Sequence, residues 1–180
     1  EQGVLRLSRT LDQLLMLARV EGRLRFDDGE ESHVADVAAC AMADSRAPDA
    51  GCFVVPGQWP AAVLAMPREL AITALRNLLD NALCHGPKEQ PIDVDARWLE
   101  EEQAVAFRVT DRGEGVSETT LEQLTQRFWR ASKVQGSGLG LAIVAAIAER
   151  FGGRLCFDND PGGGLLAEFI VPASLLADRE

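Results

Sequence analysis

The stretch that follows Pro67 repeats apolar residues at the spacing of a single helical face. They follow the i, i+3, i+4, i+7 pattern: Ala71, Ala74, Leu75, Leu78, Leu79 and Ala82. Apolar and polar residues then alternate over 92–98 and again over 105–110, as in strands with one buried face. A helix or a strand with one apolar face needs another apolar surface to cover that face. Together they predict a layer of helices packed on a sheet.

The other segments fit the same plan. Further helices are predicted from Ser32, as its cap, to about Arg46, and around 141–148. Short strands are predicted at 52–55, 62–66, 155–158 and 165–171, with the last two forming a hairpin around 161–164. The fold class is therefore α/β, an α+β two-layer sandwich. We expect a mixed sheet of about five strands with three main helices on one face.

The N-terminal residues carry a different pattern. Apolar residues alternate at steps of three and four up to Gly22: Val4, Leu7, Leu11, Leu14 and Ala18. Two heptads are too short for a stable coiled coil, so one interpretation is a bundle helix whose partners lie outside this chain or in a second chain. The alternative is an amphipathic helix docked on its own domain. We therefore divide the chain into residues 1–22 and 23–180.

Charge and composition exclude several classes. Eighteen basic and 28 acidic side chains give a formal charge of −10 at pH 7, which opposes binding to nucleic acid. The four cysteines are scattered singly beside only two histidines, so neither a metal cluster nor a disulfide framework is expected. The apolar stretches are shorter than a membrane span. We expect a soluble piece of a longer protein.

Three groups of residues have candidate chemistry. Asn77 and Asn81 lie about 40° apart beside the apolar stripe of their helix, where an amide oxygen could hold Mg²⁺ or remain an ordinary boundary group. Asp111 shares the parity of the buried strand residues before it, so its carboxylate needs a partner; the next turn contains Gly113 and Gly115. The run 136–141, GSGLGL, opens a helix and is a candidate phosphate site.

These segments occur in a characteristic order: NLLDNALCHG, DRGEGV, RFWRAS and GSGLGLAIV. The order resembles the histidine kinase ATPase-like family, which includes sensor kinases, gyrase, a heat-shock chaperone and mismatch-repair ATPases. In that family the segments are an asparagine box, two glycine boxes and a phenylalanine segment. The resemblance covers nearly all of residues 30–172.

The resemblance implies that the chain binds ATP and Mg²⁺. It implies that Asn81 holds the metal, that Asp111 bonds the adenine amino group, and that Asn77 assists near the phosphates. Asn77, Asn81 and Arg130 are then the implied catalytic residues. The further implied nucleotide-binding residues are His85 near the nucleotide, Gly113 and Gly115 at the adenine, Phe128, Arg130 and Lys133 in a lid, and Gly136, Gly138, Leu139, Gly140 and Leu141 at the phosphates.

Two features select one branch of the family. Residues 7–22 resemble the end of the second helix of a sensor kinase's dimerisation and phosphotransfer bundle, which leaves 23–180 as the catalytic ATP-binding domain. Asn77 occupies the place where the water-activating branches have a general-base glutamate, and a neutral histidine acceptor needs no such base. Cys84 is a departure, because family members often have Lys or Arg there.

The resemblance thus implies a protein histidine kinase of a two-component system. It would position Mg-ATP for transfer to a histidine outside this fragment and then to an aspartate of a response regulator receiver domain. A second kinase subunit would pair through the N-terminal helix, and the parent would be a bacterial inner-membrane sensor with this domain in the cytoplasm. The alternatives are a nucleotide-binding regulatory module with little turnover and a degenerate scaffold.

Overall fold

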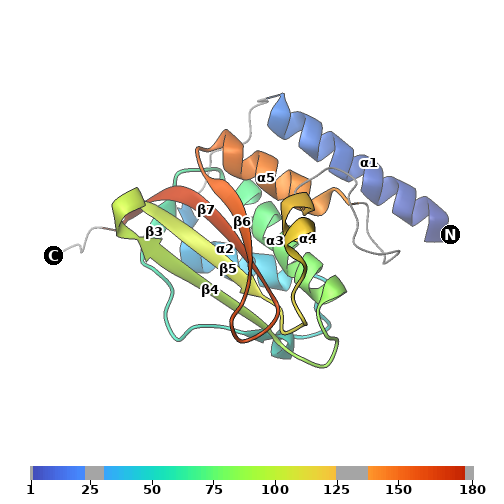
Figure 1. Ribbon diagram of the computed structural model, residues 1–180. Coiled ribbons are helices and arrows are strands. Elements are labelled where there is room, and N and C mark those ends of the chain that lie inside the picture. The colour runs from blue at the N-terminus through green and yellow to red at the C-terminus, as the bar shows by residue number, and fades with distance from the viewer. Residues whose placement is uncertain (1, 23–30, 125–137, 177–180) are drawn as a thin grey trace.

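The computed structural model describes residues 2–22, 31–124 and 138–176. The helices are α1 (Gln2–Glu21), α2 (Val34–Ala43), α3 (Arg68–His85), α4 (Glu118–Gln123) and α5 (Gly140–Arg150). The strands are β1 (Ser32–His33), β2 (Phe53–Val54), β3 (Ala62–Leu64), β4 (Ile92–Leu99), β5 (Ala104–Thr110), β6 (Arg154–Asn159) and β7 (Leu165–Leu175). Helices α2, α3 and α5 lie against one face of the sheet (Figure 1), so the predicted two-layer α/β architecture is confirmed.

The sheet is mixed, as predicted. Its order is β1-β3-β7-β5-β4-β2, and β6 pairs with the first half of β7 beside β3. Only the β2–β4 pairing is parallel among the described strands. Seven strands form where about five were expected. β2 lies within the strand predicted at 52–55, whereas β1 was not predicted, because its two residues are too few to show an alternating pattern.

The prediction that Ser32 caps the second helix is wrong. Ser32 does not cap α2; it belongs to β1, is buried, and donates from its hydroxyl to the backbone oxygen of Met66 at 2.6 Å. His33 is the residue that precedes α2, in an extended conformation and without a side-chain capping bond. A buried hydroxyl needs a partner, and the strand contact provides it.

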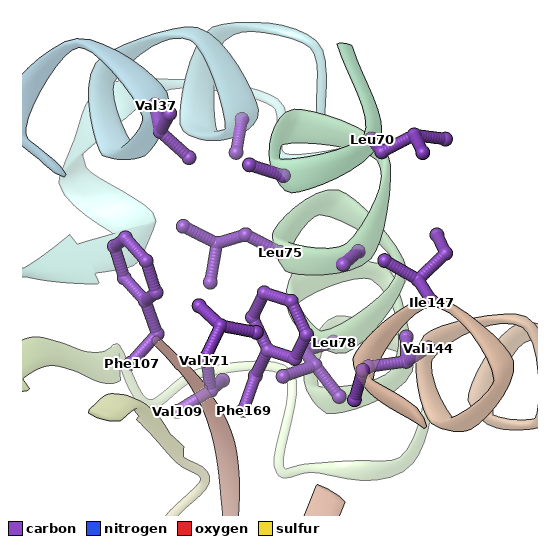
Figure 2. Packing of buried hydrophobic residues seen from close by; sticks show 14 of the residues in the cluster. Val37, Leu70, Leu75, Leu78, Phe107, Val109, Val144, Ile147, Phe169 and Val171 are labelled. Atoms are coloured by element: carbon purple, nitrogen blue, oxygen red, sulfur yellow. The ribbon is translucent and has the colours of Figure 1, made fainter. Parts of the chain in front are cut away.

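The core lies between the helices and the sheet. The predicted apolar face of α3 is buried throughout, from Ala71 to Ala82. Phe107 of β5 pairs directly with Phe169 of β7, and their rings stack at 6.4 Å beneath Leu75 and Leu78 (Figure 2). Burying each such side chain stabilises the fold by about 1.5–3 kcal/mol. This packing fixes the position of α3 relative to the ends of the strands.

The opposite face of the sheet combines a small apolar cluster around Ala106 with charged side chains. Arg108 of β5 lies between Asp95 of β4 and Glu168 of β7, with nitrogen–oxygen distances of 3.4 and 3.0 Å. The three residues are direct cross-strand partners in the register. Opposite charges at such positions favour this pairing over a shifted one.

Helix α1 packs against α5 with one face and leaves another uncovered. Leu17 and Val20 are buried, and Arg150 of α5 donates to the backbone oxygens of Arg19 and Val20 at 3.4 and 3.3 Å. Leu11 and Leu14 of the predicted seam are 55% and 40% exposed. The residues of α1 that dock on α5 therefore lie outside the predicted seam, and the bundle interpretation stays a prediction. Within the described ranges, no helix is long and apolar enough to cross a membrane.

Candidate nucleotide site

The polar edge of α3 faces the start of α5. Asn77 donates from Nδ2 to the backbone oxygen of Thr73 at 2.8 Å, which fixes the orientation of its amide. Its Oδ1 points toward Gly140, where a Cβ atom would lie only 3.1 Å away. Asn81 is half-buried one turn later, and its side chain makes no hydrogen bond within the part of the chain that the structure describes. The two predicted amides therefore lie at the boundary between α3 and α5.

The start of α5 has the geometry of an anion site. Gly138 has a φ of +74°, a left-handed conformation that favours glycine, and α5 begins two residues later at Gly140. The first amides of a helix have no partner within the helix, and the helix dipole makes this end positive. The structure thus places Gly140, from the glycine-rich segment that was predicted to bind phosphate, beside Asn77.

Asp111 is buried at the end of β5, as its parity in the strand predicted. It is 7% exposed, and its Oδ1 accepts hydrogen bonds from the backbone N–H groups of Gly113 at 2.8 Å and Leu165 at 3.2 Å. The backbone N–H of Asp111 donates to the oxygen of Leu165 at 3.1 Å. The expected partners are therefore backbone groups. No described residue donates to Oδ2, which remains available to accept a bond.

The turn after Asp111 is held against the β6–β7 hairpin. Asn159, at the end of β6, accepts at Oδ1 from the N–H of Val116 and donates from Nδ2 to the oxygen of Val116, both at 2.8 Å. Gly115 has a φ of +75°, and a Cβ there would overlap Oδ1 of Asn159. Arg112 makes a two-pronged ion pair with Asp93 of β4. Both predicted glycines, Gly113 and Gly115, lie in this turn.

The sequence patterns did not identify Asn159 or Leu165 as residues of the site. They lie far from Asp111 in the chain, and only the hairpin between them was predicted. The Asp-Pro-Gly-Gly-Gly run that follows Asn159 indicates a tight turn, but it does not indicate which other turn it packs against.

The end of α3 lies beside Asp111. Gly86 follows His85, and a Cβ at Gly86 would lie 2.9 Å from Cβ of Asp111. Partial burial lowers the pKa of His85, while the negative charge of Asp111 acts in the opposite direction. The imidazole is therefore mostly neutral at pH 7, although His85 remains substantially exposed to solvent.

Several predicted residues lie outside the described residues: Phe128, Arg130, Lys133 and Gly136. The described residues contain no cluster of three or more His, Cys, Asp or Glu side chains that could hold a metal ion. A metal in this site would therefore depend on amide oxygens and on the ligand. Gly138, Leu139, Gly140 and Leu141 are described and lie at the N-terminus of α5.

Comparison with known proteins identifies the class to which this arrangement belongs. Residues 67–175 match the model of the family described as histidine kinase-, DNA gyrase B- and HSP90-like ATPase. The chain therefore belongs to this family, as the ATP-binding domain of a sensor histidine kinase.

Two relatives illustrate the match. Sensor protein QseC of Salmonella typhi is 34% identical over 170 residues, which are 92% of this chain and 36% of that protein. Phosphate regulon sensor protein PhoR of Pseudomonas aeruginosa is 33% identical over 171 residues, 91% of this chain and 38% of that protein. The chain thus spans little more than a third of these relatives.

Solved structures share the fold. The mycobacterial sensor histidine kinase MprB superposes with a TM-score of 0.72 at 23% identity, covering 82% of this chain and 100% of that chain. The full-length ShkA structure in complex with AMPPNP gives a TM-score of 0.73 at 22% identity, covering 95% of this chain and 36% of that chain. At these identities the likeness supports the architecture alone.

Proposed function

We propose that ATP lies between α3 and α5 with its adenine against Asp111. The observation that carries this proposal is the buried Asp111 carboxylate, whose Oδ1 is held by two backbone N–H groups while Oδ2 remains available. An exocyclic amino group is a donor that a carboxylate oxygen at this position would accept. The glycine turn beside it allows a flat base to approach the backbone. His85 would flank the base as a neutral ring.

The same pose puts the phosphates at the start of α5. The first-turn amides around Gly138, Leu139, Gly140 and Leu141 would receive them, with Gly136 extending that run. Asn77 would assist near the phosphates through the second N–H of its Nδ2, since its Oδ1 accepts hydrogen bonds and cannot donate one to a phosphate oxygen. Phe128, Arg130 and Lys133 are our candidates for the lid, with Arg130 or Lys133 reaching the terminal phosphate.

The residues present fit a magnesium ion. The amide oxygen of Asn81 accepts no hydrogen bond from a described residue. Magnesium usually combines few protein oxygens with phosphate oxygens and waters. When bound, the ion would neutralise charge on the phosphates. Asn81 would hold it, and Asn77 would orient the neighbouring phosphate oxygen.

The reaction that best suits this site is phosphoryl transfer to a histidine outside the fragment. Asn77 has no basic group, and a neutral imidazole needs none to attack. The role of Asn77, Asn81 and Arg130 would be to position and neutralise the triphosphate for in-line attack. The phosphoryl group would then pass to an aspartate of a response regulator receiver domain. We also propose that the parent is a membrane sensor with this domain on the cytoplasmic side.

The second kinase subunit is our candidate partner for α1. Leu11, Leu14 and Leu15 are exposed on a face that α5 does not cover. Exposed leucines at heptad spacing are suited to a helical bundle between two subunits.

Isothermal titration of ATP into the chain, with and without Mg²⁺, tests the site. Asp111→Asn should abolish detectable binding, because it replaces an acceptor oxygen with a donor amide. Asn81→Ala should remove the magnesium dependence while leaving metal-free binding unchanged. Undiminished ATP affinity in Asp111→Asn would contradict the adenine assignment, and persistent magnesium dependence in Asn81→Ala would make Asn81 a structural residue. The scaffold alternative predicts no binding in any variant; within the described residues no observation favours it.

A further inference from the structure

The loop end of the β6–β7 hairpin holds the 111–116 turn at both of that turn's ends. Asn159 and Leu165 face each other as the last pair of that hairpin. The backbone N–H of Asp111 donates to the backbone oxygen of Leu165 at 3.1 Å, and the N–H of Leu165 donates to Oδ1 of Asp111 at 3.2 Å. Asn159 exchanges two bonds with Val116, at 2.8 Å each. The candidate adenine-binding turn is therefore clamped between two positions that are already fixed by strand pairing.

We propose that Asn159 is a positioning residue for adenine recognition, a role that rests on the proposed function. Its carboxamide acts as a strand partner for Val116, because it supplies one acceptor and one donor to the backbone N–H and C=O of that residue. This bridge fixes the far end of the turn while Leu165 fixes the near end. With both ends fixed, Oδ2 of Asp111 and the backbone of Gly113 stay aligned for the base.

The partner of these bonds distinguishes Asn159 from an ordinary turn residue. Both side-chain bonds of Asn159 reach a residue 43 positions away in the chain. The neighbouring Asp160 instead accepts from Gly162 at 2.8 Å, within its own hairpin. Asp160 thus stabilises the hairpin turn, whereas Asn159 connects the hairpin to the candidate site. The two adjacent residues form a matched pair for a test.

Glycine placement gives independent support. A Cβ at Gly115 would overlap Oδ1 of Asn159, and a Cβ at Gly164 would overlap the backbone oxygen of Asp111. The hairpin and the turn are therefore in contact at both clamped ends, with no space for a side chain between them. Such close packing requires the amide of Asn159 to occupy one position.

The experiment compares ATP with inosine triphosphate, which has the same ribose and triphosphate but a carbonyl in place of the amino group. Both nucleotides are titrated with Mg²⁺ into the wild-type chain, Asn159→Ala and Asp160→Ala. We expect Asn159→Ala to weaken ATP about tenfold, as the loss of two ordinary hydrogen bonds would. The Kd for inosine triphosphate should stay within about twofold, and Asp160→Ala should leave both Kd values within about twofold of wild type.

The outcomes are distinct. A wild-type chain that binds neither nucleotide would overturn the proposed function and this inference together. Normal wild-type binding with an unchanged ATP preference in Asn159→Ala would overturn this inference alone, as would an equal loss for both nucleotides. If Asn159→Ala does not fold, Asn159→Asp keeps the volume and replaces only the donor, and the same selective loss of ATP is expected. Faster hydrogen exchange of the Val116 amide in Asn159→Ala would support the broken bridge directly.

Discussion

The two ends of the candidate site are constructed differently. At the adenine end, comprising Asp111, the turn to Val116, Asn159 and Leu165, the described groups hold one another by backbone and side-chain hydrogen bonds. The phosphate end comprises Asn77, Asn81 and residues 138–141. There the side chain of Asn77 donates to the backbone oxygen of Thr73, while the side chain of Asn81 makes no bond to the described residues. The adenine end is positioned by the fold itself.

This difference indicates how the binding groups at each end of the site are positioned. A base is recognised through one or two directional bonds, so its acceptor has to be placed before it arrives. Phosphates carry charge and bind through several amides and a cation, which can adjust around them. Substitutions that disturb packing should therefore harm stability and base selectivity at the adenine end. At the phosphate end they should harm nucleotide affinity with little effect on folding.

Gly164→Ala should have the largest effect. The residue has a φ of +100°, and a Cβ would overlap the backbone oxygen of Asp111, which cannot rotate away. We expect a loss of about 3 kcal/mol or more in the free energy of unfolding, measured by urea titration. Gly163→Ala is the matched control, with φ +98° but 3.5 Å from its nearest atom, the oxygen of Gly113. It should lose only about 1–2 kcal/mol; equal losses would contradict the close approach at Gly164.

Gly115→Ala should rank second. Its φ of +75° costs about 1–2 kcal/mol for alanine, and displacing Oδ1 of Asn159 should add about 1 kcal/mol. Gly152→Ala has the same φ and a nearest atom at 3.9 Å, so it measures the conformational cost alone. Gly115→Ala should also reduce the preference for ATP over inosine triphosphate, and Gly152→Ala should not. If the two variants lose the same stability, the Asn159 contact contributes nothing.

Gly140→Ala tests the phosphate end. The new Cβ would lie 3.1 Å from Oδ1 of Asn77 and displace that amide. Because alanine favours a helix over glycine by up to about 1 kcal/mol, the free energy of unfolding should stay constant or rise slightly. ATP and inosine triphosphate should both bind several-fold more weakly, because they share the same triphosphate and the substitution alters no contact with the base. Gly57→Ala, with no atom within 4 Å, is the control. A selective loss of ATP alone would contradict the division into two ends.

Much of the architecture follows from pattern. The sequence predicted the buried face of α3 and the inward orientation of Phe107 and Val109. Buried residues recur with a fixed period in a helix and in a strand, so apolar residues at that spacing identify them. The pattern also predicted that Asp111 points inward. It predicted the strand at 52–55 that contains β2, but it could not reveal β1, where two residues are too few for a period, or the strand contact of Ser32.

The partners of the candidate site were harder to predict than its members. Asn77, Asp111 and Gly140 were identified from motifs that lie along the chain. That Asn77 faces Gly140, or that Asn159 bridges to Val116, depends on how distant segments pack, and no local spacing encodes it. The roles of these residues, and the lid residues Phe128, Arg130 and Lys133, stay predictions for binding experiments to test.

The smallest effect concerns His85, at the edge of the adenine end. Burial lowers its pKa below 6.5, and the Asp111 charge partly offsets that shift. A group with a lowered folded pKa contributes stability above its unfolded pKa of 6.5 and loses it as the pH falls through the folded pKa. The loss should be well under ~1 kcal/mol, because the exposed ring is screened by solvent. His85→Gln should remove this part of the pH dependence of unfolding.

Titration of the His85 ring by NMR measures the same coupling directly. In Asp111→Asn the opposing charge is gone while burial remains, so the pKa of His85 should fall further than in the wild type. Asn81→Ala, on the same helix but toward the phosphate end, should leave it unchanged. If the pKa rises in Asp111→Asn, the carboxylate does not act on this ring, and His85 does not belong to the adenine end.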